Sequence, residues 1–260
     1  MIDFCAMLPA VKKMARDAGA AILDVYQSDF TVNRKDDDSP VTQADLRAEA
    51  IILRALRQLA PDIPVVSEEA MADGAQVDVS KGRFWLVDPL DGTKEFVKRN
   101  GEFTVNIGLI WDGVPRLGVL YAPVIDRLFT GSPAGATLEE YGEAARSIIC
   151  RPAPSQGLTV LSSRSHRNPD QFDQFVRAFP VAEIHHSGSS LKFALIAAGE
   201  ADLYPRFGPT MEWDTAAGHA ILIAAGGCLS CPDGSPLTYG KPDFRNPPVV
   251  AWGTATPGIG

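Results

Sequence analysis

The feature that most constrains this chain is the stretch from Phe84 to Phe96, which reads Phe-Trp-Leu-Val-Asp-Pro-Leu-Asp-Gly-Thr-Lys-Glu-Phe. Its apolar, aromatic and β-branched start predicts a buried strand. We expect the strand to stop at Asp88-Pro89, because proline fixes φ and has no backbone N–H. Asp91-Gly92 is typical of a turn. The stretch therefore predicts a buried strand that carries two aspartates into one exposed tight turn.

Two interpretations of these aspartates are open. Asp88 and Asp91, with the backbone carbonyl of Leu90 between them, offer the oxygen ligands that Mg²⁺ prefers. An ordinary strand end with solvated aspartates has the same spacing, because Asp-Gly turns are common. Acidic residues elsewhere in the chain are needed to distinguish these two interpretations.

The overall charge excludes some partners. A formal net charge of −8 disfavours non-specific binding to nucleic acid or to anionic membranes, which needs a basic surface. No apolar run approaches the roughly 20 residues that span a bilayer. Lys12 and Lys13 interrupt the apolar pattern of the N-terminus, unlike a secretory signal. We expect a cytoplasmic protein without a transmembrane segment and without a nucleic-acid partner.

The four cysteines are too few for a disulfide framework in a chain of 260 residues. Cys228 and Cys231 form a C-x-x-C pair. A second such pair, which a zinc site needs, is missing, and no helix is expected directly after the pair, as in a thioredoxin-like site. We interpret both as structural or incidental thiols.

The first half of the chain begins with two predicted helices. Apolar residues at helical spacing predict a helix from about Asp3 to Tyr26, and residues 33–40 are expected to form a polar loop. A second helix is expected from Thr42, with its buried face formed by Leu46, Ala50, Leu53, Leu56 and Ala60. Thr42-x-x-Asp45 resembles a capping box. Asp45 is therefore either a cap alone or a cap whose fixed carboxylate has a second role.

Strands follow the two helices. A short strand over residues 64–66 ends at Ser67-Glu68-Glu69, again with acids at a strand end. Residues 103–110 and 114–121 are expected to form a hairpin through Trp111-Asp112-Gly113, and 127–130 a further strand. Strands in succession, rather than alternating with helices, indicate an α+β fold.

A proline-rich segment over residues 151–156 is the best boundary between two halves, 1–150 and 151–260, of one compact unit. In the second half we expect strands over 158–161, 201–204 and 249–252. The expected helices cover 169–179, 191–198 and 215–225.

Two places in the second half are candidates for function. Ser189 and Lys192 lie at a helix start, which is a natural anion site, although a plain serine cap with a surface lysine fits as well. Asp214 is placed at the start of the last helix, where it is either a metal ligand or an N-cap. His219, inside that helix, is interpreted as a core histidine.

Four motifs now occur in order: Pro40 to Asp45, Glu68-Glu69, Asp88 to Thr93, and Trp213 to Gly218. They resemble the P-V-T-x-x-D, E-E, D-P-[IL]-D-G-T and W-D-x-A-A-G motifs of the inositol monophosphatase superfamily, whose members are Mg²⁺-dependent, lithium-sensitive phosphatases. The match spans nearly the whole chain. Gly92 to Phe96, Gly188 to Phe193 and Tyr204 to Thr210 are most similar to the CysQ-type 3′(2′),5′-bisphosphate nucleotidases.

The resemblance implies a layered α-β-α-β-α sandwich and a set of residue roles. Asp88 would bridge two Mg²⁺ ions, with Glu68 and the Leu90 carbonyl on the first ion and Asp91 and Asp214 on the second. A third, weaker ion would lie near Glu68. Thr93 and Asp45 would orient and deprotonate the attacking water. The substrate-binding residues would be Glu68, Leu90, Asp91, Gly92, Thr93, His166, Ser189, Lys192, Arg206 and Asp214.

We therefore expect a Mg²⁺-dependent phosphomonoesterase of sulfur metabolism that converts the small molecule adenosine 3′,5′-bisphosphate to AMP, with phosphoadenylyl sulfate as a second substrate. Inositol monophosphatase activity is the first alternative, and a catalytically silent metal-binding scaffold is the second. Homodimer formation and peripheral binding to the cytoplasmic face of the inner membrane stay open.

Overall fold

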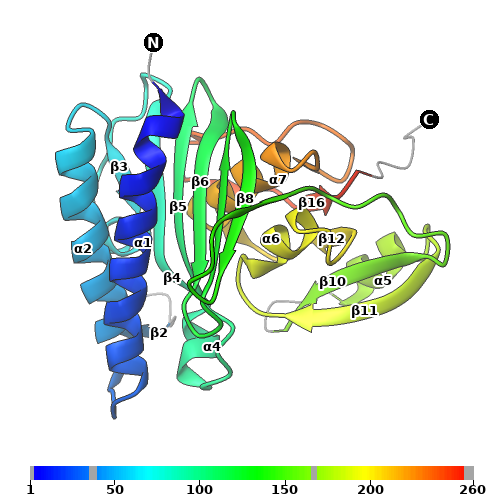
Figure 1. Ribbon diagram of the computed structural model, residues 1–260, viewed down its shortest axis with the longest axis horizontal. Helices are drawn as coiled ribbons and strands as arrows, with labels where there is room; N and C mark the ends of the chain where they lie inside the picture. The colour runs from blue at the N-terminus through cyan, green and yellow to red at the C-terminus, as the bar shows by residue number, and fades with distance from the viewer. Residues whose placement is uncertain (1–2, 35–39, 165–168, 255–260) are drawn as a thin grey trace.

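The computed structural model describes residues 3–34, 40–164 and 169–254. Five layers follow one another in Figure 1: a helix pair, a seven-stranded sheet, a second helix pair, a five-stranded sheet and a single helix. The predicted α+β fold with α-β-α-β-α layers is thus confirmed. Among the described residues, no helix has the length and apolar character that crossing a membrane requires.

The first layer consists of α1 (Phe4–Tyr26) and α2 (Gln43–Leu59), both close to their predicted bounds. Asp3 caps α1, since its side chain accepts hydrogen bonds from the backbone N–H groups of Cys5 and Ala6. The predicted buried face of α2 is partly wrong, because Leu46 is 42% exposed and Ala50 is exposed. The buried stripe is Ala44, Ala48, Ile52 and Leu56, whose small residues let α2 lie close to α1.

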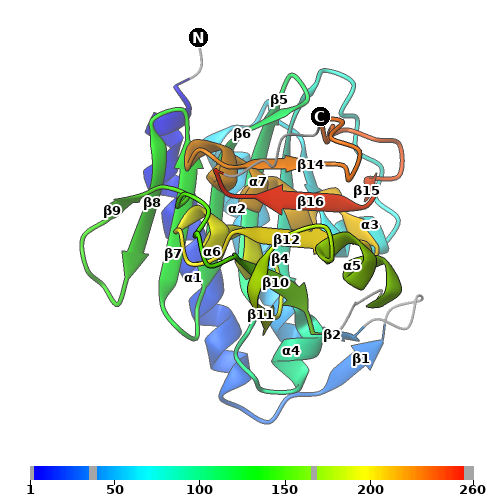
Figure 2. The ribbon, with the colours of Figure 1, turned by 90° about the vertical axis from the view of Figure 1, so that its right-hand side faces the viewer.

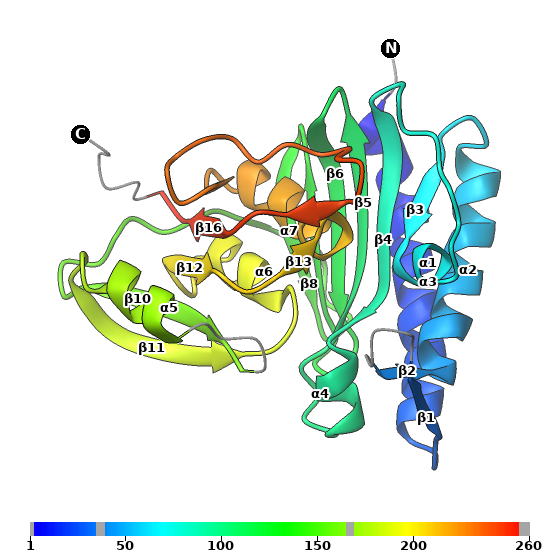
Figure 3. The ribbon, with the colours of Figure 1, turned by 180° about the vertical axis from the view of Figure 1, so that it is seen from behind.

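The predicted polar loop between these helices is wrong at its flanks. β1 (Val32–Arg34) and β2 (Pro40–Thr42) pair antiparallel, while residues 35–39 lie outside the described residues. The hairpin lies next to α4 (Thr93–Val97), near the end of β4 (Arg83–Asp91) (Figure 3).

The seven-stranded sheet has its strands in chain order, with β3 and β4 parallel and all other neighbours antiparallel. Asp112 and Gly113 both have positive φ, as a two-residue hairpin turn requires, so the predicted hairpin is confirmed. The last two strands were not expected from the sequence. The strands are β3 (Val65–Ser67), β4 (Arg83–Asp91), β5 (Thr104–Trp111), β6 (Val114–Ala122), β7 (Arg127–Ser132), β8 (Gly135–Glu140) and β9 (Arg146–Ile148).

A row of three glycines lets α7 (Glu212–Ala224) lie directly on this sheet. Gly108, Gly118 and Gly131 are in register across β5, β6 and β7. A Cβ atom added to any of them would come closer than 3.0 Å to atoms of α7. The helix itself is rich in alanine where it meets the row. The distance between α7 and the sheet is therefore set by backbone contact.

The five-stranded sheet has the order β11-β10-β12-β16-β14, and its strands run across those of the large sheet (Figure 2). α6 (Leu191–Ala197) and α7 cover one face, and α5 (Pro169–Val176) packs on the other. The edge strand β11 was not expected. Five of its residues are exposed, so its sequence does not need the alternation of apolar and polar residues that predicts a half-buried strand. The strands are β10 (Leu158–Ser163), β11 (Val181–Ser187), β12 (Leu203–Arg206), β14 (Cys228–Ser230) and β16 (Val249–Trp252).

Two short elements complete the description. α3 (Glu68–Ala72) follows β3 directly, and β13 (Thr210–Met211) pairs with β15 (Arg245–Asn246) just before α7. In the chain, the strands of the seven-stranded sheet come before residues 151–156 and those of the five-stranded sheet come after them. However, α7 of the second half packs on the sheet of the first half. The division into halves 1–150 and 151–260 stays a prediction.

Candidate active site

The strand that carries the two aspartates runs further than expected. β4 continues through Asp88-Pro89 to Asp91, with a register shift against β5 between Asp88 and Asp91. Proline fits here because the pairing with β3 ends at Val87, so the ladder on that side does not need its N–H. Gly92 then takes a φ of 96°, and α4 begins at Thr93.

The aspartates of this stretch are not on an exposed turn. Asp88 is 1% exposed, and its Oδ1 accepts a hydrogen bond from the backbone N–H of Leu90 over 3.0 Å. Asp91 Oδ2 accepts a hydrogen bond from the backbone N–H of Ser190, the residue just before α6. The interpretation as solvated aspartates at a strand end is therefore wrong.

Thr93 and Asp45 are in contact. The Thr93 hydroxyl lies 3.2 Å from both Asp45 Oδ1 and the Leu90 carbonyl oxygen. Asp45 Oδ2 accepts from the backbone N–H of Thr42 over 2.8 Å and from its hydroxyl over 2.7 Å, which confirms the predicted capping box. One oxygen of Asp45 thus caps α2 and the other faces Thr93. Burial raises the pKa of Asp45, against the hydrogen bonds from Thr42.

Asp214 accepts a backbone hydrogen bond at the start of α7, as Asp45 does at the start of α2. The helix begins at Glu212, so Asp214 is the third helical residue and not the N-cap considered above. Its Oδ2 accepts from the backbone N–H of Met211 over 2.8 Å.

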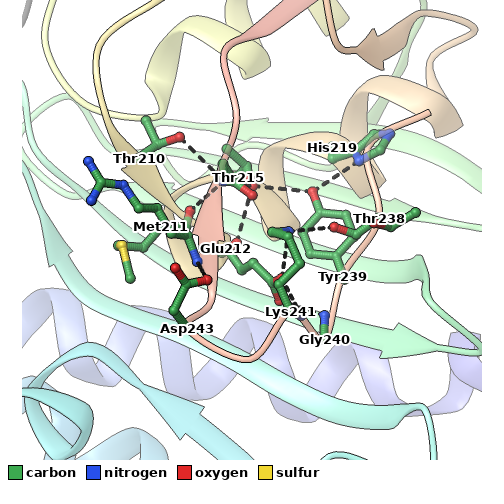
Figure 4. A network of polar contacts seen from close by, with 12 residues as sticks. Thr210, Met211, Glu212, Thr215, His219, Thr238, Tyr239, Gly240, Lys241 and Asp243 are labelled. Atoms are coloured by element: carbon green, nitrogen blue, oxygen red, sulfur yellow. Dashed lines mark hydrogen bonds and ion pairs between the residues drawn. The ribbon is translucent and has the colours of Figure 1, made fainter. Parts of the chain in front are cut away.

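A buried polar network holds this end of α7 (Figure 4). Glu212, which is 0% exposed, accepts from the backbone N–H groups of Gly240 and Lys241 and pairs with the Lys241 ammonium over 2.6 Å. The Tyr239 hydroxyl donates to Thr215 Oγ1 and lies 3.0 Å from Nδ1 of His219. His219 is buried, and burial lowers its pKa to about 3, so its prediction as a core histidine is confirmed.

A cavity of about 220 Å³ that is open to solvent is lined by residues from these elements. Five acidic side chains line it, four of which the sequence predicted. They are Glu68, Asp88, Asp91, Glu95 and Asp214, from α3, β4, α4 and α7. Thr93, Gly92 and the Leu90 backbone line the same cavity, and Asp45 is joined to it through Thr93.

The acids share one electrostatic environment. Burial and the neighbouring carboxylates Glu68 and Asp91 raise the pKa of Asp88 well above its usual range. The same causes raise the pKa of Asp214 well above its usual range. The pKa of Asp91 is also raised by burial, and the Lys192 ammonium opposes this shift. Ionised carboxylates so close together need a cation to offset their repulsion.

The donor set fits Mg²⁺ by its chemistry, since carboxylates and a carbonyl are the hard oxygen ligands that this ion prefers. Across residues 3–34, 40–164 and 169–254, however, no three His, Cys, Asp or Glu side chains are gathered as a ready ligand group. Asp88, Asp91 and Asp214 each turn one oxygen to a backbone amide instead. The assignment of individual ligands stays a prediction.

Basic side chains line the cavity together with the acids. Lys192 lines it and is 2% exposed, so the alternative of a surface lysine is wrong. Its ammonium donates to the carbonyl oxygens of Ser187 and Ser189, and burial lowers its pKa to about 7. Ser189 has a φ of 49°, which is uncommon outside glycine and is typical of functional turns.

Arg206 is the last residue of β12, which extends past the strand expected over 201–204. Its guanidinium donates to Ser163 Oγ over 2.8 Å and to the carbonyl of Pro209 over 2.9 Å, and it lines the cavity. Predicted substrate contacts thus lie around one cavity, except for His166, which lies outside the described residues.

Glu102 and Arg164 were missed. The Arg164 guanidinium donates to both oxygens of Glu102, over 2.6 and 2.8 Å, and the backbone N–H of Gly188 donates to Glu102 over 2.8 Å. This contact joins the segment before β5 to the ends of β10 and β11 at the rim of the cavity. No local pattern could indicate a pair that is 62 positions apart. The pair Cys228 and Cys231 does not line this cavity, and both thiols are free.

Comparison with known proteins agrees with this site. Residues 6–256 match the model of the inositol monophosphatase family. The chain is 49% identical over 244 residues to the 3′(2′),5′-bisphosphate nucleotidase CysQ of Salmonella typhimurium, covering 93% of this chain and 97% of that protein. It is 48% identical to CysQ of Escherichia coli strain K12, again covering 93% of this chain and 97% of that protein.

Solved structures give the same result. The crystal structure of CysQ from Bacteroides thetaiotaomicron, a bacterial member of the inositol monophosphatase family, superposes with a TM-score of 0.79 at 36% identity, covering 95% of this chain and 97% of that one. An inositol monophosphatase from Anabaena superposes with a TM-score of 0.76 at 27% identity, covering 96% and 91%. The family model covers nearly the whole chain, and two relatives share almost half of its residues. The chain belongs to the inositol monophosphatase family.

Proposed function

We propose that this chain is a 3′(2′),5′-bisphosphate nucleotidase. It removes the 3′-phosphate of adenosine 3′,5′-bisphosphate to give AMP, and it accepts phosphoadenylyl sulfate as a second substrate. The observation that carries the proposal is the meeting of Glu68, Asp88, Asp91 and Asp214 on one cavity beside the Thr93–Asp45 contact. The high identity to CysQ nucleotidases favours the nucleotide over an inositol phosphate.

Asp88, Glu68 and the Leu90 carbonyl, with Asp91 and Asp214, would hold two or three Mg²⁺ ions. When bound, Mg²⁺ activates water and neutralises charge on the phosphoryl oxygens. The acids that line the cavity supply the negative charge that holds the ions there. Because three of these acids have raised pKa values through burial and mutual repulsion, cation binding and their ionisation are coupled.

Thr93 and Asp45 would act on the attacking water. The Thr93 hydroxyl donates to Asp45 Oδ1, so its oxygen lone pairs can accept a hydrogen bond from the water and orient it. Asp45 then takes up the proton that passes through Thr93. A carboxylate whose pKa is raised by burial is a better base for this step than a solvated one.

The basic residues of the cavity would bind the part of the substrate that does not react. Adenosine 3′,5′-bisphosphate carries a second phosphate, which the carboxylates cannot hold. Lys192, Ser189 and Arg206 line the same cavity and offer cationic or hydroxyl donors. His166 is a further candidate from the sequence.

The test compares phosphate release from adenosine 3′,5′-bisphosphate and from inositol 1-phosphate, with and without Mg²⁺. We expect a much higher kcat/KM for the nucleotide, and no turnover after metal removal with a chelator. Asp91→Asn should abolish turnover, whereas Asp78→Asn, at an exposed acid, should not change it. Preference for inositol 1-phosphate would favour the monophosphatase alternative. Full activity of Asp91→Asn would remove Asp91 from the metal site.

A further inference from the structure

Strand β5 carries a buried amide side chain beside the acids, and the proposed reaction does not use it. Asn106 is 0% exposed and pairs across the ladder with Asp88 of β4. Paired residues on antiparallel strands have their side chains on the same face, with Cβ atoms about 4.5–5.5 Å apart. Asn106 thus lies on the face of the sheet that carries Asp88 and that meets the start of α6.

Asn106 is connected to Asp91 through one residue, Ser190. The Ser190 hydroxyl donates to Asn106 Oδ1 over 2.8 Å and lies 2.8 Å from the hydroxyl of Thr104. The backbone N–H of Ser190 donates to Asp91 Oδ2. The side chain of Ser190 is therefore fixed by β5, while its amide holds the acid at the end of β4.

The amide nitrogen of Asn106 is a second, independent observation. Among the described residues, Nδ2 of Asn106 has no hydrogen-bond partner, although it is fully buried. A buried donor without a partner destabilises a fold, and an apolar residue of the same size would avoid that loss. An asparagine at this position therefore has a role other than packing, and its neighbours point to the acids.

We propose that Asn106 is a positioning residue for the metal site: it fixes Ser190, and the Ser190 amide in turn holds the Asp91 carboxylate in the orientation that a metal ligand needs. The inference rests on the proposed function, because Asp91 is assigned as a ligand only there. Loss of groups that orient metal ligands typically weakens metal affinity about 10- to 100-fold. Asn106 acts through an intermediate residue, so we expect the lower end of this range.

The experiment measures metal binding directly, without turnover. Mn²⁺ is the probe, because it shares the oxygen ligands of Mg²⁺ and free Mn²⁺ can be counted by its electron paramagnetic resonance signal. We expect the Kd for Mn²⁺ to rise about 10-fold in Asn106→Ala and by a similar factor in Ser190→Ala. If Asn106 acts through Ser190, the variant that combines both substitutions should bind Mn²⁺ as tightly as either single variant.

Thr130→Val is the matched control, since Thr130 is also a buried polar residue of the sheet and its bond to Thr137 lies away from the cavity. Its Tm should fall as much as that of Asn106→Ala, or more, while its Kd stays that of the wild type. If Asn106→Ala does not fold, the nearly isosteric Asn106→Leu replaces it.

An unchanged Kd in Asn106→Ala would overturn the inference, and so would effects that multiply in the double variant or an unchanged Kd in Ser190→Ala. Failure of the proposed function looks different. In that case the wild type does not bind Mn²⁺ at the cavity, or Asp91→Asn binds it as tightly as the wild type.

Discussion

The hydroxyl of Thr93 and Oδ1 of Asp45 are 3.2 Å apart, although the two residues are separated by 48 positions and lie at the starts of different helices. The other oxygen of Asp45 is occupied by the cap of α2. The contact therefore uses the oxygen of Asp45 that does not cap α2.

Replacing Thr93 by valine tests this contact. Valine keeps the shape of threonine but cannot orient water or pass on its proton. We expect kcat to fall by at least about 100-fold, as for other losses in general acid–base catalysis, with the Kd for Mn²⁺ unchanged. Single-turnover phosphate release measures the chemical step. Thr137→Val, on β8, is the control. If kcat is retained while metal affinity falls, Thr93 is a structural residue of the turn.

Lys192→Met tests the recognition of the second phosphate. Methionine fills the buried space of Lys192 but loses the charge and the bonds to Ser187 and Ser189. A charge-assisted hydrogen bond to phosphate is worth about 1.5–3 kcal/mol, so kcat/KM for adenosine 3′,5′-bisphosphate should fall about 10- to 150-fold. For a substrate with one phosphate the loss should be small.

Lys98→Met, at an exposed lysine after α4, serves as the control for removing a positive charge. Equal losses for both substrates would mean that Lys192 supports the turn rather than the phosphate.

Gly118→Ala tests the close contact between α7 and the sheet. The added Cβ would meet the backbone of α7 at Ala217, which cannot move alone. We expect a free energy of unfolding lower by about 1–3 kcal/mol, as in other overpacked cores, together with reduced activity because Asp214 is carried by the same helix. Chemical denaturation measures the first effect. Gly253→Ala is the control, since its new Cβ would only reach ordinary contacts at 3.7 Å. A destabilised but fully active Gly118→Ala would show that the position of α7 does not control the site, and an undestabilised variant would contradict the close contact.

His219 predicts a dependence of stability on pH. Its pKa is about 3 in the folded chain and about 6.5 when unfolded. Between these values the unfolded chain binds a proton that the folded chain does not, so the free energy of unfolding decreases as pH falls from about 6.5 towards 3. The slope from this group is at most about 1.4 kcal/mol per pH unit.

His219→Gln keeps a side chain that can bond to Tyr239 but does not titrate. Urea denaturation at pH 7 and pH 5 should show a smaller loss of stability at pH 5 in this variant than in the wild type. The same loss in both proteins would assign the acid sensitivity to other groups.

Local patterns predicted most of the fold. The capping box of α2, the hairpin at Asp112-Gly113 and the last helix all follow from the sequence because each depends on neighbours within a few positions. The exposed strand β11 and the hairpin of β1 and β2 could not be predicted. Neither shows alternating apolar and polar residues, because β11 is an exposed edge strand and β1 and β2 have three residues each.

At the site, the sequence predicted which acids are special but not how they are held. It indicated Asp88 and Asp91 as an exposed pair, whereas Asp88 is buried where β4 pairs with β5. It also could not predict the contacts made over long separations, such as Glu102 with Arg164 and Asn106 with Ser190. These pairs form because the two sheets pack around α6 and α7. A local sequence pattern carries no information on that packing.

The glycine row also bears on the choice of metal ion. Mg²⁺ takes oxygen ligands at about 2.0–2.1 Å and Ca²⁺ at about 2.3–2.6 Å, so a few tenths of an ångström separate a site for one ion from a site for the other. In the proposed site, Asp214 comes from α7 and the remaining ligands from the sheet side, and Gly108, Gly118 and Gly131 fix the spacing of these two layers. The selectivity of the enzyme for a small divalent ion would then depend on three residues that have no side chain and bind no metal.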